Sequence, residues 1–212
     1  MKTSELVNVL ANDGIYDRHA IWRNVGKVLP VCMLMIAVVF FTSIGMRANI
    51  SAGQALMATS MKLVITASLA ILGLRTAVKL AKSNQESAAT RYVLLLVPAI
   101  LAAMIVVDLL QTGASGWYSR LIGASGWRCV VTIPLLSILP LGGILFAFRD
   151  AAVTRHALTG AVAGIAAAGI GASFYALNCG EDSPLFLAFW YGIATAIVAA
   201  AGAIACRMTM RW

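Results

Sequence analysis

The chain has 212 residues, of which 61% are hydrophobic and only 11% are charged. Soluble domains carry about a quarter charged residues, so this composition excludes an ordinary soluble protein and indicates an integral membrane protein. The formal net charge is +8, but the basic residues stand at the ends of apolar segments, not in a stripe with stacking aromatics between them. This distribution is typical of membrane orientation and argues against direct nucleic-acid binding.

A polar segment, residues 1–24, precedes six apolar runs. Each run is near the roughly 20 residues that a helix needs to cross the hydrocarbon core of a bilayer. Continuous apolar runs do not alternate as barrel strands do, so the sequence predicts an all-α polytopic membrane protein, a bundle of six transmembrane helices. The predicted transmembrane domain covers residues 25–212, with spans at about 26–46, 55–77, 92–111, 129–148, 157–177 and 185–206.

The orientation of the bundle follows from the positions of lysine and arginine. Twelve of the 16 lie at one set of span ends and three at the opposite set, while Lys62 lies within the second span. The twelve are Lys2, Arg18, Arg23, Lys27, Arg75, Lys79, Lys82, Arg91, Arg149, Arg155, Arg207 and Arg211; the three are Arg47, Arg120 and Arg128. Because cytoplasmic loops carry the excess of positive charge, the sequence predicts that both termini face the cytoplasm (N-in/C-in).

Two cysteines lie at the predicted outer boundary of the membrane. The turn between the fifth and sixth predicted spans holds Cys179 beside Glu181 and Asp182, and Cys129 opens the fourth span directly after Arg128. An oxidising outer compartment permits a disulfide between the two thiols, and thiolates are soft ligands for metals such as Cd(II). The alternative is that each cysteine is simply a small residue at a helix end.

Lys62 and Asp108 are the charges inside the predicted spans. A charge at bilayer depth is costly and therefore suggests function, and both residues fall in the outer half, where they could form an ion pair. This makes a small transporter that uses Lys62 and Asp108 the alternative function.

The sequence gives little support to an enzyme. It contains no nucleophile elbow, phosphate-binding loop, zinc-protease motif or dinucleotide fingerprint, and it predicts no cofactor. A membrane thiol oxidoreductase that passes electrons to a quinone would need paired thiols at each active turn, whereas this chain has one thiol at each turn.

The N-terminal segment, residues 1–24, is predicted to contain a short helix with Leu6, Val7 and Leu10 on one face. The sequence Asn12-Asp13-Gly14 ends it. Such an apolar stripe can pack on the bundle, lie at the lipid interface or bind a soluble partner.

Several motifs resemble the NrsF-like family of six-span membrane anti-sigma factors. The most specific is Cys179-Gly180-Glu181-Asp182-Ser183-Pro184, which continues to Trp190-Tyr191-Gly192. The others are Met1-Lys2-Thr3-Ser4-Glu5-Leu6, Gly126-Trp127-Arg128-Cys129, Leu158-Thr159-Gly160-Ala161 and the terminal Arg211-Trp212.

The resemblance implies a multi-pass protein of the bacterial inner membrane that holds an extracytoplasmic-function sigma factor inactive on the cytoplasmic face. It further implies two outward-facing cysteines that are needed for the response to heavy-metal stress, and by motif these are Cys129 and Cys179. Residues 1–24, with Leu6, Val7 and Leu10, then become the candidate contact for the sigma factor. The family usually has His-Cys-Pro where this chain has Asn178-Cys179-Gly180, so the resemblance supports thiol chemistry at this turn more than direct metal chelation.

Overall fold

A computed structural model describes the greater part of the chain, and this part is helical apart from short turns. The residues described are 18–47, 53–82, 99–110, 117–123, 125–149, 151 and 153–210. The helices, in chain order, are α2 (Arg18–Ser43), α3 (Gly53–Lys82), the unlabelled Ala99–Leu110, α5 (Trp117–Ile122), α6 (Gly126–Phe148), α7 (His156–Ala176), α8 (Pro184–Phe186), the π-helix η2 (Leu187–Tyr191) and α9 (Gly192–Thr209).

Within the described residues, five helical segments are long and apolar enough to cross a membrane. They correspond to five of the six predicted spans, so the prediction of an all-α membrane bundle is confirmed at this level. The span predicted at 92–111 is described only as the shorter apolar helix Ala99–Leu110, and the rest of it lies outside the described residues. The count of six spans therefore stays a prediction.

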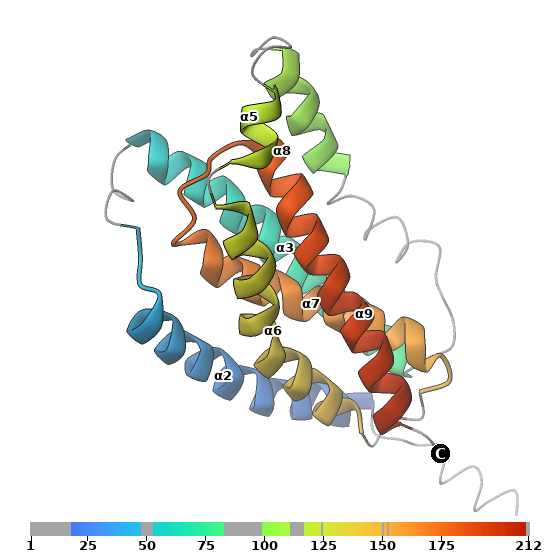
Figure 1. Ribbon diagram of the computed structural model, residues 1–212. Helices are drawn as coiled ribbons and strands as arrows, with labels where there is room; N and C mark the ends of the chain where they lie inside the picture. Colours follow the sequence, from blue (N-terminus) through green and yellow to red (C-terminus); the bar gives the residue numbers. More distant parts are fainter. Residues whose placement is uncertain are drawn as a thin grey trace, which may run out of the picture.

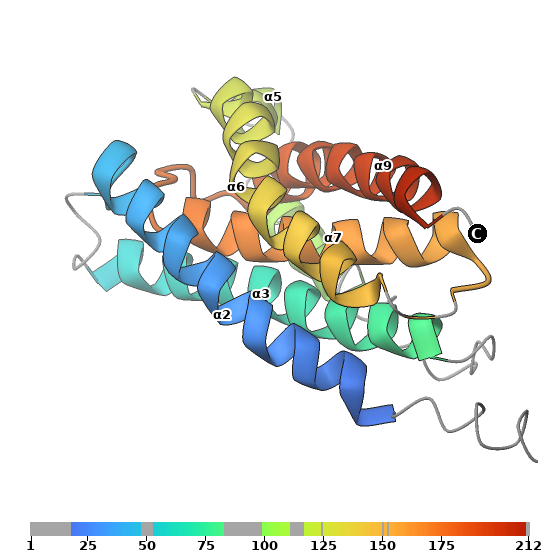
Figure 2. The same ribbon diagram turned by 90° about the horizontal axis from the view of Figure 1, so that it is seen from below.

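The central helix of the bundle is α7, which packs against α3, α6 and α9, whereas α2 lies on the outside against α6 (Figures 1 and 2). In the apolar stretch of α7, 67% of the residues are buried, compared with 17% in that of α2. The reason lies in the small residues of α7, which let neighbouring backbones approach. A Cβ atom added to Gly164 would stand 2.5 Å from the carbonyl oxygen of Val198 on α9, and one added to Gly169 would stand 2.6 Å from the amide nitrogen of Ala70 on α3.

Two sets of helix ends meet at opposite ends of the bundle. The end that carries Arg47, Cys129 and Cys179 is called the thiol end below, and the other is called the basic end. At the basic end the starts of α2 and α7 pack with the ends of α3, α6 and α9, in a core that includes Ile21, Val25, Ala77, Phe148, Val162 and Met210. The same end carries Lys79 and Lys82 in the last turn of α3 and Arg207 in the last turn of α9.

Candidate functional site: a thiol pair at one end of the bundle

The turn that carries Cys179 begins where α7 ends and is fastened to the end of α2. The amide of Cys179 donates to the carbonyl oxygen of Tyr175 at 3.0 Å, which completes the last turn of the helix. The Asn178 side-chain amide donates to the carbonyl of Gly45 at 3.0 Å, and the Arg47 backbone amide donates to the carbonyl of Leu177 at 3.1 Å. These contacts tie the ends of α2 and α7 together at the thiol end.

Cys129 and Cys179 meet in the interior of the thiol end. Cys129 lies in the first turn of α6, and its thiol donates to the carbonyl of Ser125 at 3.6 Å. The two cysteines are 0% and 3% exposed and belong to one cluster of buried residues, and their side chains are close enough to interact electrostatically. The sequence placed both thiols at one boundary of the membrane; the structure brings them side by side as free thiols.

Two buried tyrosines line the thiol pair. Tyr175 of α7 interacts with the Cys129 side chain, and Tyr191 of η2 stands beside the Cys179 thiol. Their ring centroids are 6.1 Å apart. The Tyr191 hydroxyl is buried and makes no hydrogen bond of standard geometry to any described residue. This hydroxyl is therefore able to donate a hydrogen bond to an ionised or modified cysteine sulfur.

The surroundings of Cys179 favour its ionised form. The neighbouring side chain of Cys129 lowers the pKa of the Cys179 thiol most, while burial raises it. The backbone N–H of Glu181 and the positive charge of Lys62 lower the pKa of this thiol further. Because the thiolate is the nucleophile and the metal ligand, these contacts activate Cys179.

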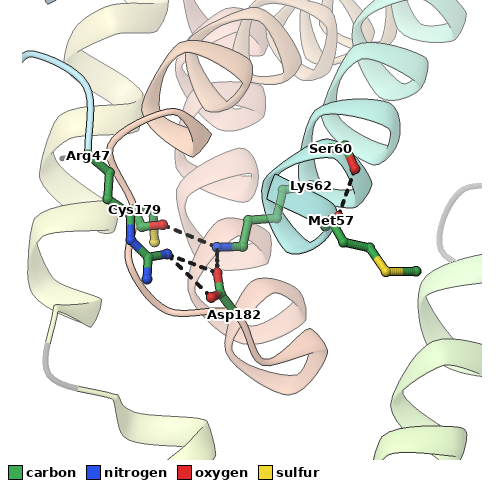
Figure 3. Close-up of polar contacts among 6 residues, drawn as sticks. All are labelled: Arg47, Met57, Ser60, Lys62, Cys179 and Asp182. Atoms are coloured by element: carbon green, nitrogen blue, oxygen red, sulfur yellow. Dashed lines mark hydrogen bonds and ion pairs between the residues drawn. The ribbon is translucent and has the colours of Figure 1, made fainter. Parts of the chain in front are cut away.

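A buried cation holds the Cys179 turn in place (Figure 3). Lys62 reaches from α3, is 4% exposed, and donates from Nζ to Oδ1 of Asp182 at 2.7 Å and to the carbonyl oxygen of Cys179 at 3.2 Å. Arg47, just after α2, forms a second ion pair with Asp182, with 3.3 Å between Nη1 and Oδ2. Asp182 therefore receives one cation from α3 and one from the end of α2.

The structure assigns the two intramembrane charges separate partners. The pairing of Lys62 with Asp108 that the sequence suggested is wrong, because Lys62 binds Asp182 and Asp108 binds Arg120 of α5 at 2.6 Å. Depth along a span could be read from the sequence, but the direction in which each side chain faces could not. The two charges consequently do not form the common site on which the transporter alternative was based.

The other predicted site residues have unequal parts in the site. Asp182 is central to it, and Glu181 contributes its backbone N–H. Arg128 is exposed, and its positive charge lies near enough to Tyr175 to act on it electrostatically. The candidate sigma-factor contacts Leu6, Val7 and Leu10 lie outside the described residues.

The π-helix η2 was not foreseen. One extra residue per turn at Leu187–Tyr191 lets Tyr191 face Cys179, while the Trp190 indole N–H donates to the carbonyls of Leu121 at 2.8 Å and Ile122 at 3.1 Å. Gly126 lies under the Trp190 ring, where any Cβ would collide with it. Short π-helices are frequent at functional sites, and the aromatic run after Pro184 was the only sequence signal for this one.

The chemistry available at this site is that of two adjacent thiols. They can be oxidised to a disulfide, or they can lose their protons and bind a soft metal ion together. Among the described residues there is no group of three or more histidine, cysteine, aspartate or glutamate side chains that would hold a metal.

These features define a multi-pass α-helical membrane protein with a buried thiol pair at one end of its bundle. The chain belongs to the family described as NrsF, negative regulator of sigma F, whose family model matches residues 10–212.

Two curated proteins are similar to part of the chain. A probable anti-sigma-F factor NrsF of Azospira oryzae is 34% identical over 95 residues, which is 44% of this chain and 45% of that protein. The anti-sigma-F factor NrsF of Caulobacter vibrioides is 34% identical over 94 residues, 44% of each chain. The chain thus matches less than half the length of these relatives. No solved structure matches it significantly.

The adjacency of the two thiols predicts that a mild oxidant joins them. Diamide accepts two electrons and two protons, and one sulfur–sulfur bond replaces the two S–H bonds. Mass spectrometry of the protease-digested protein should show the Cys129–Cys179 peptide pair, with Cys32 and Cys206 still alkylated as free thiols. Dominant pairing with Cys32 or Cys206, or linkage only between separate chains, would contradict the arrangement described.

Proposed function

We propose that the chain is a membrane-bound anti-sigma factor that sequesters an extracytoplasmic-function sigma factor at the bacterial inner membrane. Membership of the NrsF family and the anti-sigma names of both relatives support this role. The role is regulatory and not enzymatic. Both termini face the cytoplasm, where the excess of lysine and arginine lies, and the thiol end faces outward.

The trigger in this proposal is the pair Cys129 and Cys179, which senses oxidative or heavy-metal stress. The observation that carries it is the proximity of two free, buried thiols in one core cluster, with Cys179 in surroundings that favour the thiolate. Oxidation transfers two electrons to the stress oxidant, and a soft metal instead displaces both protons. Either change alters the spacing of the two sulfurs.

The bundle offers a route from this trigger to the cytoplasmic face. Cys129 is part of α6 and Cys179 follows α7 directly, so any change in the spacing of the sulfurs acts on the packing of these two helices. Because α7 is closely packed against α3 and α9 as well, a displacement at the thiol end reaches the basic end as a rigid-body shift. The switch requires two arrangements close in energy, with the thiol state favouring one.

Replacing Cys129 and Cys179 together with serine should abolish induction and leave repression intact. The readout is a reporter driven by a promoter that depends on the sigma factor, with and without diamide or cadmium. The matched control replaces the two other buried cysteines, Cys32 and Cys206, with serine and should respond like the wild type. Normal induction in the Cys129/Cys179 variant would exclude the thiol trigger.

The sigma-factor contact is proposed to lie in residues 1–24, on the face formed by Leu6, Val7 and Leu10. An amphipathic helix binds a soluble partner by burying its apolar face. The variant Leu6→Asp/Leu10→Asp should therefore lose repression, giving constitutive reporter activity at normal protein abundance. The control Ser4→Asp/Asn8→Asp adds the same two charges at the same spacing on the opposite face and should keep repression. Loss of repression in both variants, or in neither, would exclude this face as the contact.

A further inference from the structure

Lys62 is a buried ammonium group on a helix that otherwise faces lipid and core. Taking such a group out of water is costly, and well-packed apolar side chains in place of a buried ion pair often stabilise a protein as well or better. The lysine therefore calls for an explanation other than packing. Its contacts supply one, because both of its hydrogen bonds go to the turn that carries Cys179, more than 100 residues away in sequence.

The two contacts of Lys62 restrain the turn at two separate points. One is the carbonyl oxygen of Cys179 itself and the other is the carboxylate of Asp182, three residues later (Figure 3). With both ends of the Cys179–Asp182 segment bound to one ammonium group, the segment cannot rotate away from the bundle. The Cys179 sulfur is thereby kept against Cys129 of α6.

The position of Lys62 on α3 is itself fixed by hydrogen bonds. One turn further along α3, Thr66 donates to the carbonyl of Lys62 at 2.9 Å and accepts a hydrogen bond from Ser173 of α7 at 3.0 Å. The position of Lys62 relative to α7 is thus set by a buried polar contact. Arg47 reinforces the other side of Asp182, but it is more exposed, with 27% of its side chain accessible against 5% for Lys62.

We propose that Lys62 is a positioning residue that holds the Cys179 turn over Cys129 and so makes bond formation between the two sulfurs favourable. Preorganisation is the physical basis, since a turn already held in the bonding arrangement loses less conformational entropy when the bond forms. The proposal rests on the proposed function in giving this bond a role in sensing, but the positioning itself can be measured on the purified protein.

The test is the thiol–disulfide equilibrium of the full chain in detergent, measured in glutathione buffers of set composition at an acidic pH at which both thiols are protonated. At that pH the loss of the Lys62 charge cannot favour the disulfide by destabilising the Cys179 thiolate, so the equilibrium reports positioning alone. Lys62→Met, which fills the site with a similar apolar volume, should lower the equilibrium constant for the Cys129–Cys179 disulfide about tenfold. Lys62→Arg, which keeps charge and donors, should recover part of the loss. Lys79→Met removes the same charge from an exposed position about 25 Å further along α3 and should match the wild type.

A second measurement separates positioning from a merely structural role. Because the Asp182 side chain is 36% exposed and keeps its ion pair with Arg47, Lys62→Met leaves no buried charge unpaired and should not lower the thermal unfolding midpoint in detergent. The double variant Lys62→Met/Asp182→Asn should lower the disulfide equilibrium constant by less than the product of the two single effects. Both single changes break the Lys62–Asp182 contact, and only Asp182→Asn also breaks the ion pair with Arg47. An equilibrium constant equal to that of the wild type in Lys62→Met would overturn the proposal. So would a fall accompanied by loss of thermal stability, or a wild type that forms no Cys129–Cys179 disulfide.

These outcomes are independent of the cellular test of function. Lys62→Met with an unchanged equilibrium, together with loss of induction on replacing both cysteines, rejects the positioning role and keeps the thiol trigger. A lowered disulfide equilibrium constant in Lys62→Met, together with normal induction in the Cys129/Cys179 variant, keeps the positioning role and rejects the thiol trigger.

Discussion

The buried ammonium group of Lys62 is the contact on which the thiol end depends. It joins α3 to the turn after α7, and Asp182 extends the same network to Arg47 at the end of α2. Three helices that are distant in sequence are in this way held at one end of the bundle by one carboxylate and two cations. A cation buried in a membrane protein is expensive, and this one uses its hydrogen bonds on the backbone and side chain of the turn that bears Cys179.

The helix that links this end to the rest of the molecule is α7. Its glycines allow the backbones of α3 and α9 to approach closely. A closely packed interface of this kind responds to force by shifting as a unit. Through α7, a change in the distance between the two sulfurs at the thiol end can displace helix ends at the basic end, where the proposed partner binds.

The sequence predicted the outline of this structure and missed its internal contacts. Apolar runs located five helices because burial in lipid depends on length and composition, although α2 begins eight residues before its predicted span and α3 ends five residues after its own. The common boundary of Cys129 and Cys179 followed from counting alternating spans. The partner of Lys62 could not be predicted in this way. It depends on the rotation of α3 about its axis, which is set by the small-residue faces of α7. Likewise, Arg47 looked like an ordinary interfacial arginine, and nothing in the aromatic run after Pro184 specified a π-helix that turns Tyr191 toward the thiols.

The proposed switch is tested most directly by asking whether oxidation of Cys129 and Cys179 releases the sigma factor. The tagged protein would be solubilised in mild detergent from its native host, with half of the cells treated with diamide before lysis, and the co-purified sigma factor quantified by mass spectrometry. We expect near-stoichiometric sigma factor with the wild-type protein from untreated cells and its loss after diamide treatment. The Cys129→Ser/Cys179→Ser variant should retain the sigma factor under both conditions. Equal amounts of sigma factor from treated and untreated wild-type cells, with the Cys129–Cys179 disulfide present, would contradict the proposed switch.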